Sequence, residues 1–305
     1  MQAPSVTAVP ILDLLQSNPG LLWVASFVLG LMVGSFLNVV ILRLPRQLNR
    51  EWRAQCAELI ANGESGPPIQ PNDDERFDLL TPPSQCPLCR HRIRPWENIP
   101  LLSYLLLRGR CSGCNARISP RYPTVELLTG VLSVIVVVHF GVSIAALAAL
   151  LLTWVLIALA GIDLDHQLLP DDLTLPALWL GLLLSLVPVF VPATTAIVGA
   201  VVGYLVLWSV YHLFRWLTGK QGMGYGDFKL LGMLGAWLGW QALPLIVVLA
   251  SVVGAAVGIA LIAGLGRHRD QPIPFGPFLA AAGWIYLLWG DELMPAYLAL
   301  AGLSR

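Results

Sequence analysis

The chain alternates between long apolar runs and short polar breaks over most of its length. Runs of about 18 or more apolar residues are typical of membrane-spanning helices. The pattern therefore predicts an all-α polytopic membrane protein with about eight transmembrane helices. The predicted spans are residues 21–42, 123–140, 144–162, 173–191, 194–216, 228–240, 243–265 and 277–289. The sixth and eighth of these runs are conspicuously short.

One long polar segment, residues 43–122, interrupts this pattern after the first span. It contains all five cysteines and twelve arginines. Residues 1–20 contain no Lys or Arg, so they lack the positive region of a cleavable signal peptide, and the first span is expected to be retained. The predicted organisation is an N-terminal segment (1–20), a first transmembrane helix (21–42), a polar loop domain (43–122) and a seven-helix membrane domain (123–305).

Composition agrees with a membrane protein. Hydrophobic residues make up 56% of the chain, charged residues 12%, and the mean hydropathy is +0.72. An average soluble domain has roughly 25% charged residues. The formal net charge is zero, so no global basic field indicates a nucleic-acid partner.

The positions of the basic residues predict an orientation. If the eight spans place residues 43–122 in the cytoplasm, 17 of the 18 Lys and Arg residues face that side and only Arg305 lies outside. Basic residues in short loops set orientation by the positive-inside rule. Outside the long loop, the inward-facing basic residues are Arg215, Lys220, Lys229, Arg267 and Arg269. Both chain ends are then expected outside.

The long loop carries a metal-binding pattern. Its cysteines form two C-x2-C pairs separated by 21 residues: Cys86, Cys89, Cys111 and Cys114. Two such knuckles can complete a closed four-sulfur zinc site, whose role would be structural because no coordination position stays open. Two disulfides are the alternative, which a reducing cytoplasm disfavours. The fifth cysteine, Cys56, is interpreted as a plain loop thiol.

An arginine-rich loop with zinc also resembles a nucleic-acid-binding module. An acidic cluster in the same loop weakens that interpretation: Asp73, Asp74, Glu75 and Asp78. Orientation and contact with anionic membrane lipids already account for the arginines. We therefore expect membrane lipids, and no nucleic acid, as partners of the loop.

Two acidic motifs lie where apolar runs end or begin. The first, GIDLDHQLLPD, contains Asp163 and Asp165, and the second, GYGDFK, contains Asp227. Ionisable residues at membrane spans are costly and usually functional. Two carboxyl groups held close together can divide the roles of base and acid in peptide hydrolysis without a covalent intermediate. The pattern predicts a catalytic pair, Asp163 and Asp227, in a membrane-embedded protease.

Other functions for these acids stay open. Asp171 and Asp172 fit helix capping, because they precede an apolar run. Asp227 could cap the next helix as well as catalyse. An ion- or proton-coupled transporter also uses paired intramembrane acids, although no internal repeat is evident here. A non-enzymatic assembly factor of a secretion system is a third possibility, in which both aspartates would tolerate substitution.

Taken together, the motifs resemble the bifunctional type IV prepilin peptidases, or leader peptidase/N-methyltransferases. The matching segments are GSFLNVVILRLP (34–45), the two cysteine pairs, NIPLLS (98–103), LRGR (107–110), ISPRYPTVE (118–126) and both aspartate motifs. They are spread over nearly the whole chain, and the combination is highly specific although each segment alone is not.

This resemblance implies a GxGD-type aspartic protease of the bacterial inner membrane. Such enzymes cut the basic leader from type IV prepilins and type II secretion pseudopilins at the cytoplasmic face, after Gly. They then methylate the new N-terminus with S-adenosylmethionine, and the cysteine loop contributes to that activity. The family's second aspartate corresponds to Asp227. Its first lies seven residues before Pro170, which selects Asp163 over its rival Asp165.

Overall fold

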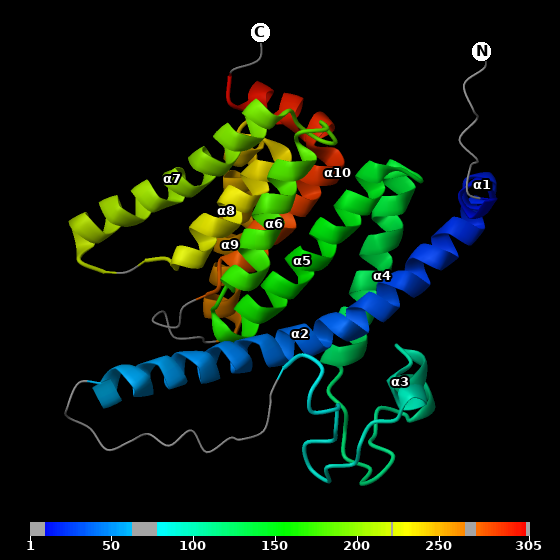
Figure 1. The fold of residues 1–305 in the computed structure, drawn as a ribbon. Helices are drawn as coiled ribbons and strands as arrows, with labels where there is room; N and C mark the ends of the chain where they lie inside the picture. The colour runs from blue at the N-terminus through cyan, green and yellow to red at the C-terminus, as the bar shows by residue number, and fades with distance from the viewer. Residues whose placement is uncertain (1–9, 63–77, 221, 266–272, 303–305) are drawn as a thin grey trace. The chain divides into compact units, whose positions relative to one another are not determined.

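The computed structural model describes residues 10–62, 78–220, 222–265 and 273–302. Helices dominate this part of the chain, and strand pairing in it is limited to two isolated bridges. The helices, drawn in Figure 1, are α1 (Pro10–Ser17), α2 (Pro19–Asn62), α3 (Leu102–Leu106), α4 (Arg121–Phe140), α5 (Ile144–His166), α6 (Asp171–Leu184), α7 (Ala193–Thr218), α8 (Tyr225–Leu238), α9 (Ala242–Leu265) and α10 (Gly276–Leu300), with a 3-10 turn at Pro95–Asn98. The all-α prediction is confirmed.

Five of the described helices are long and apolar enough to cross a membrane. They are Pro19–Leu59, Arg121–Phe140, Ile144–His166, Ala193–Thr218 and Ala242–Gly264. The other three predicted spans correspond to α6, α8 and α10. Helices α6 and α8 have only 14 residues each, and α10 is interrupted at Trp289 by non-helical backbone angles. The count of eight therefore stays a prediction.

Three helices differ in extent from the predicted spans that they contain or overlap. The first helix continues past Leu42 to Asn62, with Pro45 inside it, and ends where the sequence reaches Gly63. The run 173–191 is helical only to Leu184, since the backbone turns at Ser185 ahead of Pro188. The last helix extends from Gly276 to Leu300, well beyond the predicted end at 289.

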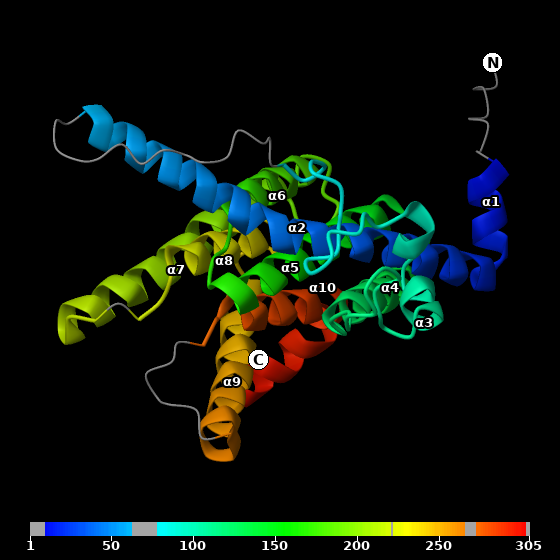
Figure 2. The same ribbon diagram turned by 90° about the horizontal axis from the view of Figure 1, so that it is seen from below.

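The structure divides into two compact units, residues 26–132 and residues 1–25 with 133–305. In the second unit, α8 is the central helix, because α6, α7, α9 and α10 all pack against it. Figures 1 and 2 show α7 and α6 beside it. Almost every side chain from Asp227 to Leu238 is buried. A helix that is apolar on all faces belongs in the interior, which explains how a run of only 14 residues can be a core element.

Helix α7 approaches α8 at two glycines. A Cβ atom added to Gly199 would lie 2.2 Å from the carbonyl oxygen of Gly235. No larger residue fits at this contact, and the two backbones touch directly. Small residues allow such close packing between membrane helices, where van der Waals contact is a main source of association. Helix α8, which carries Asp227, is thus held tightly along its length.

Candidate functional site

Asp163 lies in the last turn of α5 and is only 5% exposed. The helix ends at Gln167, whose backbone adopts the left-handed conformation and whose N–H donates to the Asp163 carbonyl oxygen at 2.9 Å. The carboxyl group itself accepts a hydrogen bond on Oδ2 from the backbone N–H of Gly276, at 3.0 Å. Asp163 is therefore fixed between the end of α5 and the start of α10.

Asp227 lies in the first turn of α8 and is 7% exposed. Gly226, just before it, packs against the loop that follows α5: a Cβ at this glycine would lie 2.7 Å from the Cβ of Leu169. The carboxyl group of Asp227 interacts electrostatically with that of Asp163. The fold thus places the second aspartate motif against the loop that follows the first, and the catalytic pairing of Asp163 with Asp227 stays a prediction.

The other acids of the first motif lie differently. Asp165 is exposed, whereas Asp163, two residues earlier on the same helix, is buried. Asp171 and Asp172 are both exposed and form the first two residues of α6, where their charges favour the positive end of the helix dipole; the N-cap itself is Pro170, without a side-chain cap, so the predicted capping role is wrong. Asp171 also pairs with Lys229, whose Nζ lies 2.7 Å from each carboxylate oxygen.

Sequence reasoning missed Gly276. It is 113 residues from Asp163, and a Cβ at this position would lie 2.6 Å from Oδ2 of that aspartate. The only local signal is the Gly-Pro pair that opens the last apolar run. Only the packing of α10 against α5 reveals that this glycine borders the aspartate site.

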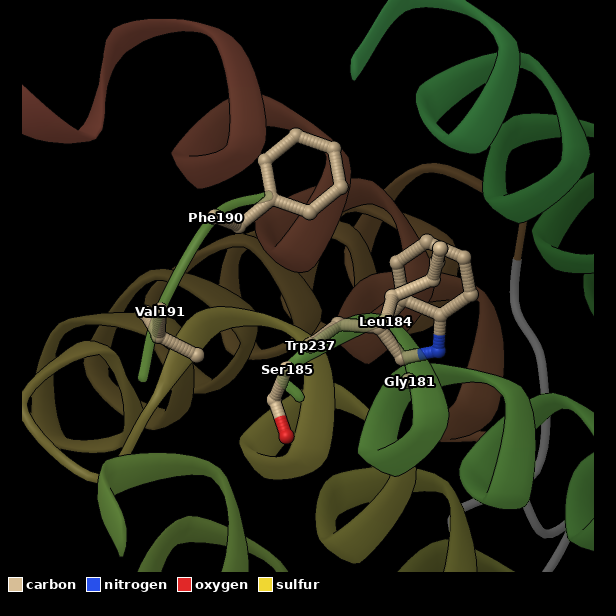
Figure 3. A pocket seen from close by; sticks show the side chains of 6 residues that line it. All are labelled: Gly181, Leu184, Ser185, Phe190, Val191 and Trp237. Atoms are coloured by element: carbon tan, nitrogen blue, oxygen red, sulfur yellow. The ribbon is translucent and has the colours of Figure 1, made fainter. Parts of the chain in front are cut away.

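A small hollow lies apart from the aspartate site. It is lined by residues of α6, of α8 and of the segment between α6 and α7. Its lining residues are Gly181, Leu184, Ser185, Phe190, Val191 and Trp237 (Figure 3). It has no volume that a water-sized molecule could occupy. Trp237 lies ten residues after Asp227, close to the other end of α8, so the hollow is not part of the aspartate site.

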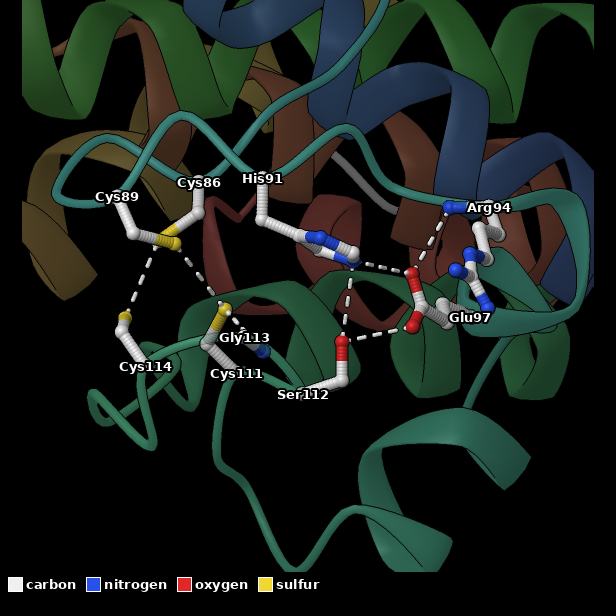
Figure 4. Close-up of polar contacts among 9 residues, drawn as sticks. All are labelled: Cys86, Cys89, His91, Arg94, Glu97, Cys111, Ser112, Gly113 and Cys114. Atoms are coloured by element: carbon white, nitrogen blue, oxygen red, sulfur yellow. Dashed lines mark hydrogen bonds and ion pairs between the residues drawn. The ribbon is translucent and has the colours of Figure 1, made fainter.

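The four paired cysteines converge in the unit formed by residues 26–132 (Figure 4). Their Sγ atoms all lie within 4.8 Å of one another. The Cys86–Cys114 and Cys89–Cys111 sulfur pairs are each 3.9 Å apart. Four sulfurs around zinc at about 2.3 Å form a tetrahedron with edges of about 3.8 Å. The arrangement therefore fits a four-cysteine zinc site and excludes disulfides in this state, since all five cysteines are free thiols.

Two neighbouring thiols of the cluster have pKa values that are shifted in opposite directions. The backbone N–H groups of Cys89 and Leu88 lower the pKa of the Cys86 thiol to about 6. For Cys89, a backbone hydrogen bond at His91 lowers the pKa, but burial and the neighbouring sulfurs outweigh it and raise the pKa to about 12. Thiolate is the form that binds zinc. Cys56 is exposed and does not belong to the cluster; it lies on helix α2 and not in the predicted loop.

A second polar network joins the two cysteine knuckles. Glu97 accepts hydrogen bonds from Ser112 Oγ at 2.7 Å and from the Arg94 N–H at 2.9 Å, and it lies 3.1 Å from His91 Nε2 (Figure 4). These contacts, led by the Arg94 N–H, lower the pKa of Glu97 to about 2. Because His91 follows the first knuckle and Ser112 is part of the second, Glu97 holds the two together.

Glu126 connects the loop to the first turns of α4. It is a buried acid whose Oε2 accepts the Leu101 N–H at 2.9 Å, just before α3. Its backbone also touches α2, since a Cβ at Gly34 would lie 2.7 Å from the Glu126 Cα. Three segments quoted above for the family resemblance, 34–45, 98–103 and 118–126, therefore meet at one buried carboxyl group. The acidic residues Asp73, Asp74 and Glu75 lie outside the described residues.

Comparisons with known proteins place the chain among enzymes. Residues 28–140 match the model of the bacterial peptidase A24 N-terminal domain, and residues 150–259 match that of the type IV leader peptidase family. Among curated proteins, the prepilin leader peptidase/N-methyltransferase of Aeromonas salmonicida (strain A449) is 57% identical over 95% of this chain and 98% of its own length.

Other curated relatives carry the same name. The Pseudomonas aeruginosa protein is 53% identical over 97% of this chain and 100% of its own length, and that of Xanthomonas campestris is 46% identical over 95% and 99%. No solved structure is significantly similar to the chain. The relatives support the enzyme interpretation and not the transporter interpretation. Because the identity is this high over nearly the full length, the chain belongs to the prepilin leader peptidase/N-methyltransferase family.

Proposed function

We propose that the chain cuts the basic leader from type IV prepilins and type II secretion pseudopilins after Gly, and then methylates the new N-terminus. The observation that supports it most directly is the pair of buried, interacting carboxyl groups of Asp163 and Asp227 in a chain of this family. One carboxylate activates water, and the other carboxyl group donates a proton to the departing amine. Hydrolysis then needs no covalent intermediate.

The proposed setting is the bacterial inner membrane, with the aspartates at the cytoplasmic face. The twelve arginines in residues 43–122 support this orientation. Residues 1–20 are then periplasmic, 21–42 form the first span, 43–122 the cytoplasmic zinc loop linked to methyl transfer, and 123–305 the membrane domain with the protease site. A prepilin with a basic leader and a long apolar helix would enter laterally from the lipid.

The zinc ion would be held by Cys86, Cys89, Cys111 and Cys114. It would supply a rigid link between the two knuckles and no reaction chemistry, because sulfur fills all four positions. S-adenosylmethionine is the methyl donor that the family resemblance implies. Among the described residues, no strand is followed by a glycine-rich turn and a helix, which is the pattern of a familiar S-adenosylmethionine site.

Cleavage of a prepilin by the purified protein in detergent tests this proposal. The wild type is compared with Asp163→Asn, Asp227→Asn and, as a matched control, Asp165→Asn. We expect the first two variants to be inactive and the third to cleave. If only Asp227 and Asp165 matter, the first catalytic residue is misassigned. If all three variants cleave like the wild type, the aspartate mechanism is wrong.

A further inference from the structure

An ion pair links the two aspartate motifs to each other. Lys229 Nζ lies 2.7 Å from both carboxylate oxygens of Asp171. Lys229 follows Asp227 by two residues on α8, and Asp171 follows Asp163 by eight residues, at the start of α6. The ion pair thus joins segments 58 residues apart in sequence, each beside one of the two buried aspartates.

The helices that carry this pair run in parallel from the aspartate site. Near their N-terminal ends they are joined by Asp171 and Lys229. Farther along, Trp237 Nε1 of α8 donates to the carbonyl oxygen of Ala177 of α6, at 2.8 Å. The ion pair is therefore the polar contact between α6 and α8 that lies at the end nearest Asp227.

The start of α6 lies close to the end of α5 along the chain. Only residues 167–170 separate α5 from α6, and within them Leu169 packs against Gly226 of the second motif. A shift of the first turn of α6 relative to α8 would pull on this short connection. Because Asp163 occupies the last turn of α5, the shift would change its distance to Asp227.

We propose that Asp171 and Lys229 are positioning residues that hold the Asp163 and Asp227 carboxyl groups at their working separation. This inference rests on the proposed function. The side chains of Lys229 and Asp171 are 31% and 51% exposed, so the pair contributes little to global stability. Its effect is on alignment, where a displacement of about 1 Å lowers a reaction rate by about 100-fold.

A double-mutant cycle tests this coupling. The variants are Asp171→Asn, Lys229→Met and the double variant, assayed as full-length protein in detergent with a prepilin. We expect each single variant to lower kcat by about 10- to 100-fold with little change in KM. The double variant should be no worse than the worse single one, because either change alone breaks the same contact. Lys229→Arg, which keeps the charge, should recover most of the activity.

Asp172→Asn is the matched control, since it removes an exposed carboxylate from the same turn of α6. We expect it to cleave like the wild type, which would exclude a general effect of charge at the start of this helix. Methylation of an already cleaved pilin, measured in the same preparations, reports whether each variant is folded. It should be unchanged throughout.

Several outcomes would overturn the inference. Losses that multiply in the double variant would show that the two residues act independently. A change in KM alone would assign Lys229 to substrate or lipid binding, and a joint loss of cleavage and methylation would make the pair a folding element. Asp163→Asn and Asp227→Asn are assayed alongside. If Asp163→Asn and Asp227→Asn are inactive but Asp171→Asn and Lys229→Met cleave normally, only the positioning role is contradicted. If Asp163→Asn and Asp227→Asn cleave normally, both the proposed function and the positioning role are contradicted.

Discussion

The aspartate site and the cysteine site are held together by different means. The four cysteines fall within 29 consecutive residues, and each pair lies on its own short knuckle. The two aspartates are 64 residues apart and belong to α5 and α8. Local turns and a network of side-chain hydrogen bonds bring the sulfurs together, whereas packing around a buried helix brings the carboxyl groups together.

This difference determines how each site should respond to substitution. In the aspartate site, a side chain is placed by backbone elements that touch it from distant parts of the chain, such as α10. A substitution far away in sequence can therefore disturb it. In the cysteine site, the ligands and their supporting residues are neighbours in sequence, and damage should stay local. Since the two sites lie in different compact units, their activities should be separable.

The largest effect on the aspartate site, apart from removal of the aspartates themselves, is expected from Gly276→Ala. The new Cβ would lie 2.6 Å from Asp163 Oδ2, so the carboxyl group must move and its bond from the Gly276 N–H is disturbed. Prepilin cleavage should fall by at least about 100-fold. Methylation of a cleaved pilin should persist. The control is Gly264→Ala in α9, where nothing lies within 4 Å of the new atom. Equal cleavage by the two variants would contradict the role given to Gly276.

A substitution in the cysteine site should lower methylation and largely spare cleavage. Cys86→Ser removes one of four ligands, and we expect loss of bound zinc with a decrease in methylation on the order of 50-fold, because structural zinc contributes folding energy to a small domain. Cleavage should change far less. Zinc content is measured by elemental analysis and methylation by mass spectrometry. Cys56→Ser, which removes the exposed thiol outside the cluster, is the control and should behave as the wild type. Equal loss of both activities would show that the two sites are not separable.

A smaller effect is expected where the loop meets α4. Glu126→Ala leaves the Leu101 N–H without its acceptor, and an unsatisfied buried donor costs about 1–3 kcal/mol. The start of α3 should then loosen, with methylation lowered by about tenfold. Limited proteolysis of the loop measures this loosening directly. Glu126→Gln retains an acceptor oxygen and should recover most of the activity. If the glutamine variant is as impaired as the alanine variant, the charge matters and not the hydrogen bond.

The same comparison explains what could be predicted from sequence. The C-x2-C spacing reveals its site because the turn that unites each pair is encoded between the two cysteines. Asp163 and Asp227 were paired from their positions at the ends of apolar runs, and their catalytic pairing stays a prediction. The role of Gly276 could not be predicted from the sequence, because it depends on the contact of α10 with α5, two helices distant in sequence. Whether the short helices α6 and α8 span the membrane stays a prediction, since an apolar run does not distinguish lipid from protein surroundings.

Glu97→Gln should change zinc affinity and not a catalytic rate, and it tests whether the cysteine site depends on its local network. The amide keeps the shape of the side chain but removes the negative charge of the carboxylate, whose oxygens accept hydrogen bonds from the Arg94 N–H and Ser112 Oγ. Second-sphere changes of this kind commonly lower metal affinity by about tenfold or somewhat more. Competition with a chelator measures the zinc affinity of both proteins, and Glu58→Gln, an exposed acid on α2, is the control.

The difference in zinc affinity between the wild type and Glu97→Gln should depend on pH in a defined way. The pKa of Glu97 is lowered from 4.5 to about 2 in the folded loop, so the carboxylate contributes stability fully above its ordinary pKa and loses that contribution only as pH falls toward 2. The gap in zinc affinity between wild type and Glu97→Gln should therefore stay constant from about pH 8 to pH 5. A gap that changes in that range would contradict the role given to the Glu97 carboxylate.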